Sequence, residues 1–159
     1  MKPTLLNVYD PKCRPADQVQ TWEALGTVQV ADLVDVVHAP TPEPDSYAAA
    51  LQARWEAPGD LLVCEQDIVP RVWHLLSLLD CPEDFCAWDY LLANGVPWSA
   101  NEAHFGAGLV KYGPSARAYV VERPQVPQMT WKGMPALLRW RLPPFHVHRP
   151  LVVHNHRGA

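Results

Sequence analysis

The chain has 159 residues, of which 48% are hydrophobic and 19% are charged. This size and composition predict a single compact domain over residues 1–159 and exclude two well-cored ones. Asp and Glu (17) outnumber Lys and Arg (13), so no overall positive field would attract nucleic acid or an anionic membrane. The sequence has no run of 18 apolar residues and no secretory signal pattern, so we expect a cytoplasmic protein without a membrane partner.

The first half of the chain alternates between expected strands and helices. Apolar runs predict strands over 5–9, over 27–37 with a short turn, and over 61–64. Apolar residues at helical spacing predict helices over 15–25, 46–57 and 71–80. The run 61–64 is apolar at every position, as expected of a strand that is buried on both faces of a parallel sheet. This alternation favours an α/β fold whose mostly parallel central sheet has helices on both faces.

The second half is less regular. Strands are expected over 85–92 and 145–156, and a strand or turn over 105–112. A loop is expected over 95–101 and a short helix over 131–140. Gly106 and Gly108 indicate that a ligand or another part of the chain comes close to the backbone of residues 105–112.

The four cysteines are irregularly spaced, so no disulfide framework is expected. Cys81 and Cys86 supply half of a zinc site, but no Cys-x-x-Cys motif accompanies them and the nearest histidines lie far along the chain. We therefore do not expect a structural zinc ion.

Two acidic residues, Glu65 and Asp67, directly follow the most apolar strand. Ligands of open α/β sheets collect at the carboxyl ends of the strands, and residues two apart on an extended chain project to the same side. Two carboxylates there would suit a hard divalent cation. The alternative is that Asp67 caps the next helix and Glu65 faces solvent.

Histidines are concentrated at the end of the chain. Four of the seven lie within its last 14 positions, as His146, His148, His154 and His156. Neutral imidazole binds divalent transition metals, so we expect at least one of these residues to be a ligand. We expect the others to form hydrogen bonds to backbone or acidic groups.

The sequence resembles the small GT-A-type glycosyltransferase-like proteins, many of them encoded by phages, that keep little more than the nucleotide-sugar half of that fold. The resemblance is carried in order by residues 61–70, 81–86, 105–110 and 146–156. It implies a Rossmann-like GT-A domain that transfers a sugar from a nucleotide-sugar donor, with a UDP-sugar favoured, to an acceptor hydroxyl. If the protein is phage-encoded, it would act in the host cytoplasm.

The resemblance also implies a metal site. Glu65 and Asp67 take the place of the family's DxD motif, which holds Mn²⁺ or Mg²⁺ against the diphosphate. Because the first carboxylate is Glu rather than Asp, Asp67 is the preferred ligand of the two. His156, or else His154, would be the C-terminal ligand.

Nucleotide contacts are expected from the loop after the first strand. There Tyr9 is suited to stack on a base, Asp10 to bind ribose hydroxyls and Arg14 to pair with phosphate. Lys111 is a further phosphate candidate. Each of these residues has an ordinary surface role as its alternative.

The acceptor side is less defined. An inverting enzyme needs a carboxylate base, for which Asp89 and Glu102 are candidates, whereas a retaining enzyme needs none. Trp88, Trp98 and His104 offer stacking surfaces or pack in the core.

The acceptor itself stays open, and a hydroxymethylated base in DNA is one option. The charge balance gives DNA no support, although a C-terminal arginine group offers local phosphate contacts, at Arg139, Arg141, Arg149 and Arg157. A noncatalytic nucleotide- or sugar-binding module is the main alternative function, because the chain is short for a complete GT-A enzyme. A zinc hydrolase that uses the histidine-rich tail is a third interpretation.

Overall fold

The computed structural model describes residues 2–12, 15–91, 95–100, 108–121, 146–150 and 153–154. Its strands are β1 (Thr4–Tyr9), β2 (Asp35–Pro40), β3 (Leu61–Glu65), β4 (Ile68–Val69), β5 (Phe85–Trp88), β6 (Leu109–Tyr112), β7 (His146–His148) and β8 (Val153–His154). Its helices are α1 (Pro15–Leu25), α2 (Val28–Leu33), α3 (Pro44–Trp55), α4 (Val72–Asp80) and α5 (Pro114–Val121), with a short 3₁₀ helix, η1 (Trp98–Ala100).

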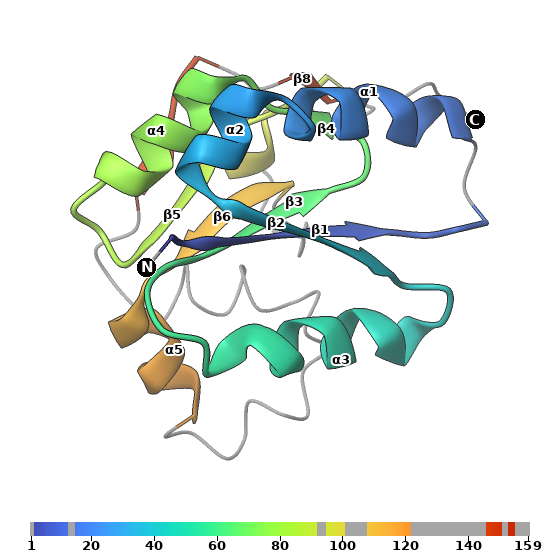
Figure 1. Cartoon of the computed structure of the whole chain (residues 1–159). Helices are drawn as coiled ribbons and strands as arrows, with labels where there is room; N and C mark the ends of the chain where they lie inside the picture. Colours follow the sequence, from blue (N-terminus) through green and yellow to red (C-terminus); the bar gives the residue numbers. More distant parts are fainter. Residues whose placement is uncertain are drawn as a thin grey trace.

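Six of the strands form one twisted sheet in the order β2-β1-β3-β6-β5-β7 (Figure 1). The pairs β1–β2, β1–β3 and β5–β7 are parallel, whereas β6 runs antiparallel to both β3 and β5. Five strands therefore share one direction and end at the same edge of the sheet. The predicted mostly parallel sheet is confirmed, with β6 as the antiparallel exception.

Helices cover both faces of this sheet, as predicted. Figure 1 shows α1, α2 and α4 on one face, and α3 and α5 on the other. Between these layers the first four residues of β3 are fully buried, which confirms the expectation drawn from its unbroken apolar run. None of the helices in the described parts of the chain has the length and apolarity needed to cross a membrane.

The segment expected to form a strand over 27–37 instead contains helix α2, and β2 begins only at Asp35. Thr27 is the N-cap of α2, and its hydroxyl accepts a hydrogen bond from the Val30 amide. Val30 is buried while Val28 is 73% exposed, so burial falls on one face at helical spacing. The cap and this tertiary packing override the β propensity of the valines.

The second half differs more from the prediction. Helix α5 was not predicted; it starts at Pro114, a residue favoured in the first helical turn, and it buries Ala116 and Arg117. The strand expected over 145–156 is two short strands, β7 in the main sheet and β8 paired with β4. The strands expected over 85–92 and 105–112 are shorter, as β5 and β6, and the expected loop contains η1. The helix expected over 131–140 lies outside the described residues.

Candidate functional site

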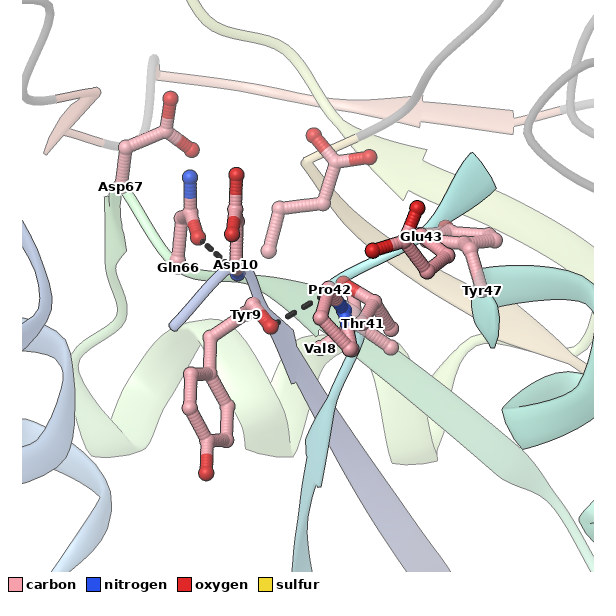
Figure 2. Close-up of a pocket in the computed structure, with 10 residues that line it drawn as sticks. Val8, Tyr9, Asp10, Thr41, Pro42, Glu43, Tyr47, Gln66 and Asp67 are labelled. Atoms are coloured by element: carbon pink, nitrogen blue, oxygen red, sulfur yellow. Dashed lines mark hydrogen bonds between the residues drawn. The ribbon is translucent and has the colours of Figure 1, made fainter. Parts of the chain in front are cut away.

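A pocket of about 450 Å³ lies where β1, β2 and β3 end. This is the edge at which open α/β sheets bind ligands, and the volume suits a small molecule or nucleotide. Its lining comes from the ends of these three strands, the turn after β3 and the start of α3: Val8, Tyr9, Asp10, Thr41, Pro42, Glu43, Tyr47, Glu65, Gln66 and Asp67 (Figure 2).

The turn between β3 and β4 is held on two sides. The Glu65 amide donates to the carbonyl oxygen of Gly108 at 2.8 Å, which ties the end of β3 to the residue before β6. From α1, the buried Thr21 hydroxyl lies 2.6 Å from the carbonyl oxygen of Gln66 and 2.8 Å from that of Ile68. The backbone that carries the two acidic side chains is therefore fixed by its neighbours.

The alternative interpretation of Asp67, as the cap of the following helix, is wrong. Strand β4 intervenes, and the N-cap residue of α4 is Arg71. Asp67 instead lines the pocket, where Figure 2 shows its carboxylate on the same side as Asp10 and Gln66, across from Glu43 and Tyr47.

Gln66, between the two acidic residues, joins the ends of β3 and β1. Its Oε1 accepts a hydrogen bond from the Asp10 amide at 2.5 Å (Figure 2). Asp10 is fixed further by the Lys12 amide, which donates to its Oδ1 at 2.8 Å, and by Gln18 Nε2, which donates to its carbonyl oxygen at 2.7 Å. Sequence reasoning missed Gln66, and its only signal was its position between two acidic residues at a strand end.

The end of β2 is tied to that of β1 in a similar way. The amide and hydroxyl of Thr41 both donate to the carbonyl oxygen of Tyr9, at 2.7 and 3.0 Å. The Tyr9 ring packs edge-on against Trp22, with 5.3 Å between ring centroids. The position of the Tyr9 ring is thus set by α1 as well as by β1.

The pocket is strongly acidic. Four carboxylates line it: those of Asp10, Glu43, Glu65 and Asp67. Burial, followed by the negative charge of Glu65, raises the pKa of Tyr47 well above its usual value, so this phenol stays neutral. Lys12 pairs with Glu43 at 3.3 Å, but both side chains are exposed to solvent, which screens the pair. An anionic ligand would therefore need a cation to bind here.

The donor atoms fit a hard cation. Carboxylate oxygens are the preferred ligands of Mg²⁺ and Mn²⁺. Within the part of the chain that the structure describes, no three of the pocket's carboxylates bring their oxygens within 4.8 Å of one another. Glu65 and Asp67 would thus supply part of a coordination shell, and phosphate oxygens, water or a further side chain would complete it.

The C-terminal chain returns to this region. Strand β8 pairs antiparallel with β4, which sets the backbone of His154 opposite Ile68, one residue beyond Asp67. The side chain of His154 and the whole of His156 lie outside the described residues, so their role as ligands stays a prediction.

Lys111 and Asp89 do not line the pocket. Lys111 is buried on β6, and its ammonium donates to the carbonyl oxygen of Cys81 at 2.6 Å. It is therefore not available to a phosphate in the pocket, and the sequence-based role is corrected on this point. Asp89 is fully buried after β5 and accepts hydrogen bonds from the Ser99 amide and hydroxyl, at 3.0 and 2.6 Å. Its Oδ2 also pairs with Arg149 at 3.6 Å.

The remaining candidates divide in two. Trp88 is no stacking surface for an acceptor, because it is 2% exposed and its indole donates to the carbonyl oxygen of His74. Outside the described residues or side chains lie the other acceptor and phosphate candidates: Arg14, Trp98, Glu102, His104, Arg139, Arg141 and Arg157.

Comparison with known proteins bears on the fold. No family model matches the sequence, and no curated protein matches it. Among solved structures, the crystal structure of a glycosyltransferase involved in the glycosylation of the major capsid of PBCV-1 matches with a TM-score of 0.59 at 14% identity. The match covers 100% of this chain and 95% of that one. The chain shares the fold of this glycosyltransferase. The predicted Rossmann-like α/β fold class is thereby confirmed over the whole length compared.

Proposed function

We propose that the protein is a metal-dependent glycosyltransferase that moves a sugar from a nucleotide-sugar donor to an acceptor hydroxyl. One observation carries the proposal: Glu65 and Asp67 follow the four buried apolar residues of β3 and line a nucleotide-sized pocket at the carboxyl edge of the sheet. A fold shared with a glycosyltransferase over nearly the full length of both chains supports it.

The nucleoside end of the donor would lie against β1. Asp10, whose backbone is fixed from both sides, presents a carboxylate that suits ribose hydroxyls. Tyr9, held against Trp22, would stack on or border the base. The resemblance of the sequence favours uracil as that base. Thr41 keeps the ends of β1 and β2 together beneath this part of the pocket.

The diphosphate would lie against the acidic turn. Glu65 and Asp67 would hold Mn²⁺ or Mg²⁺, and a further ligand would come from His154 on β8 or from His156. Such a cation, when bound, neutralises the charge that develops on a departing nucleoside diphosphate. Hydrogen bonds to Thr21 and Gly108 hold the backbone that carries these two carboxylates, which limits how far the pair would have to move to bind the cation.

The acceptor and its base are less constrained. Asp89 is engaged by Ser99 and Arg149. We therefore propose Glu102, which lies outside the described residues, as the first candidate for the base of an inverting mechanism and keep Asp89 as the second. A modified DNA base stays one possible acceptor, although a net charge of -4 gives it no support.

Catalysis can be tested before the acceptor is known. We expect the full-length protein with Mn²⁺ to release nucleoside diphosphate from one member of a nucleotide-sugar panel, with UDP-sugars first. Asp67→Asn should slow this release by about tenfold or more, because it removes a ligand charge. Glu56→Gln, at an exposed residue just after α3 and away from the pocket, should leave the rate unchanged.

Three results would contradict the proposal. Release that is equally fast in Asp67→Asn would place the chemistry elsewhere. Metal-dependent binding of a nucleotide without turnover of any donor would instead favour the noncatalytic module. Turnover that requires Zn²⁺ and fails with Mn²⁺ or Mg²⁺ would favour the hydrolase.

A further inference from the structure

Two cysteines from the α4–β5 region and one histidine from β7 meet toward the edge of the sheet opposite β2. They are Cys81, Cys86 and His148, and their ligand atoms all lie within 4.8 Å of one another. Among the described residues, no other group of three or more His, Cys, Asp or Glu side chains has its ligand atoms this close together.

The fold explains why these residues meet. Cys81 is the C-cap residue of α4, and Cys86 lies on β5 a few residues later. Strand β7 pairs parallel with β5 and sets His148 opposite Trp88. Because Cys86 and Trp88 are two residues apart on one strand, they project to the same face, toward the His148 ring.

The condition of the three side chains fits a set of metal ligands. Both cysteines are free thiols, with Cys86 fully buried and Cys81 9% exposed. The Nε2 atom of His148 is buried and has no hydrogen-bond partner within the described part of the chain. Buried polar atoms are nearly always paired, and none of the described protein atoms pairs with this nitrogen. Its lone pair is therefore available to a metal ion.

We propose that Cys81, Cys86 and His148 bind a zinc ion. Thiolate sulfur and imidazole nitrogen are preferred donors of Zn²⁺, whereas Mg²⁺ and Mn²⁺ prefer oxygen. Two cysteines and one histidine leave one position of a tetrahedral site open, and a second histidine would complete the Cys₂His₂ set of structural sites. Tetrahedral bonds of about 2.0–2.3 Å set the ligand atoms about 3.5–3.8 Å apart, so each side chain would move by about 1 Å or less. Water or the imidazole of His146, whose ring centroid is 4.4 Å from that of His148, would take the fourth position.

The surrounding charges agree with this assignment. Burial, followed by the influences of His146 and Lys111, lowers the pKa of His148 to about 4, which keeps its imidazole neutral. Burial also raises the pKa of Cys86, so a metal would displace thiol protons when it binds. The Lys111 ammonium, which donates to the carbonyl oxygen of Cys81, acts against this rise and favours the thiolate. Lys111, which does not line the pocket, would thus help to stabilise the thiolate ligands.

The zinc would brace the C-terminal part of the fold. It would join β7, a three-residue strand at the edge of the sheet, to the turn between α4 and β5. Directly after β7, Arg149 pairs with Asp89, and β8 then returns to Ile68 beside the acidic turn. The zinc would thus stabilise the fold, and its site is separate from the cation site proposed at Glu65 and Asp67.

Metal analysis of the full-length protein tests the proposal. Protein purified under reducing conditions from zinc-supplemented cells should contain about one zinc ion per chain. Replacement by Co²⁺ should give a thiolate-to-cobalt charge-transfer band and strong tetrahedral visible bands, which carboxylate ligands cannot produce. His148→Ala should lose most of the zinc and weaken these bands, while Cys64→Ala, at a buried free cysteine outside the group, should retain both.

The readout separates this site from the nucleotide pocket. Asp67→Asn should leave the zinc content and the cobalt spectrum unchanged. Should a ligand variant fail to fold, the wild-type zinc content and cobalt spectrum decide the matter alone. Zinc-free wild type that gives no thiolate band with Co²⁺, or a Cys81–Cys86 disulfide in place of metal, would overturn the proposal.

Discussion

A methyl group at Gly108 should destabilise the fold and disturb the acidic turn. A Cβ at this position would lie 2.4 Å from Cδ1 and 2.5 Å from Cγ1 of Ile68, and 3.4 Å from Cε1 of Tyr90. Carbon atoms pack at about 3.5–4.0 Å, so the first two contacts cannot be accommodated without movement. Ile68 is 0% exposed and has no solvent to turn into. We therefore expect Gly108→Ala to lower the free energy of unfolding by about 1–3 kcal/mol.

A double-mutant cycle, measured by urea unfolding, isolates the cause. Ile68→Ala alone should cost about 2–5 kcal/mol, because it leaves a cavity. Combined with Gly108→Ala, the loss should be smaller than the sum of the two single losses, since the new methyl group enters the vacated space. Gly59→Ala is the control: its Cβ meets nothing within 4 Å, but its φ of 80° costs about 1 kcal/mol, which should add to Ile68→Ala without coupling. If Gly108→Ala left the free energy of unfolding unchanged, or if the losses of the two variants were strictly additive, the clash with Ile68 would be contradicted.

Three further predictions concern buried polar groups. Burial, followed by a neighbouring arginine, lowers the pKa of His74 to about 4, below its unfolded value of about 6.5. The contribution of neutral His74 to the free energy of unfolding is therefore complete above pH 6.5 and is lost as the pH falls toward 4. Between these pH values, the free energy of unfolding measured with urea should change less with pH in His74→Gln than in wild type. Arg117→Met should lower the free energy of unfolding by about 2–4 kcal/mol in the same assay, because the buried guanidinium donates to three backbone carbonyls before β3. Arg54→Met, at an exposed site, is the control and should stay within about 0.5 kcal/mol of wild type. Asp89→Asn should lower stability by about 1–2 kcal/mol by weakening its bonds to Ser99, yet leave nucleotide affinity unchanged; a large loss of affinity would place Asp89 at the ligand.

The sequence predicted the part of the site that depends on strand ends. Glu65 and Asp67 were identified because an unbroken apolar run marks a doubly buried strand, and a parallel sheet brings the ends of such strands to one edge. Tyr9 and Asp10 were identified by the same rule applied to β1. The sequence gives no signal for Thr41, Glu43 and Tyr47, because the valines of α2 predict a strand and the end of β2 is then not located.

Contacts between distant segments were less accessible. The antiparallel direction of β6 could not be inferred from a local pattern, and it decides that Lys111 lies beside Cys81 rather than at the pocket. Likewise, Cys81 and Cys86 looked like half a zinc site without a histidine, since only the pairing of β5 with β7 brings His148 to them. Local periodicity predicts elements well, but sheet order depends on packing over the whole chain.

The central claim is that the pocket at the ends of β1, β2 and β3 binds a nucleoside diphosphate through a divalent cation. Isothermal titration of UDP into the full-length protein, with and without Mn²⁺, tests it most directly, with Asp67→Asn as the variant and Glu56→Gln as the control. We expect binding that requires Mn²⁺, weakens by about tenfold or more in Asp67→Asn and is unchanged in Glu56→Gln. Binding of equal strength without metal or in Asp67→Asn, or no binding of UDP, GDP, CDP, ADP or dTDP with Mn²⁺, would contradict it.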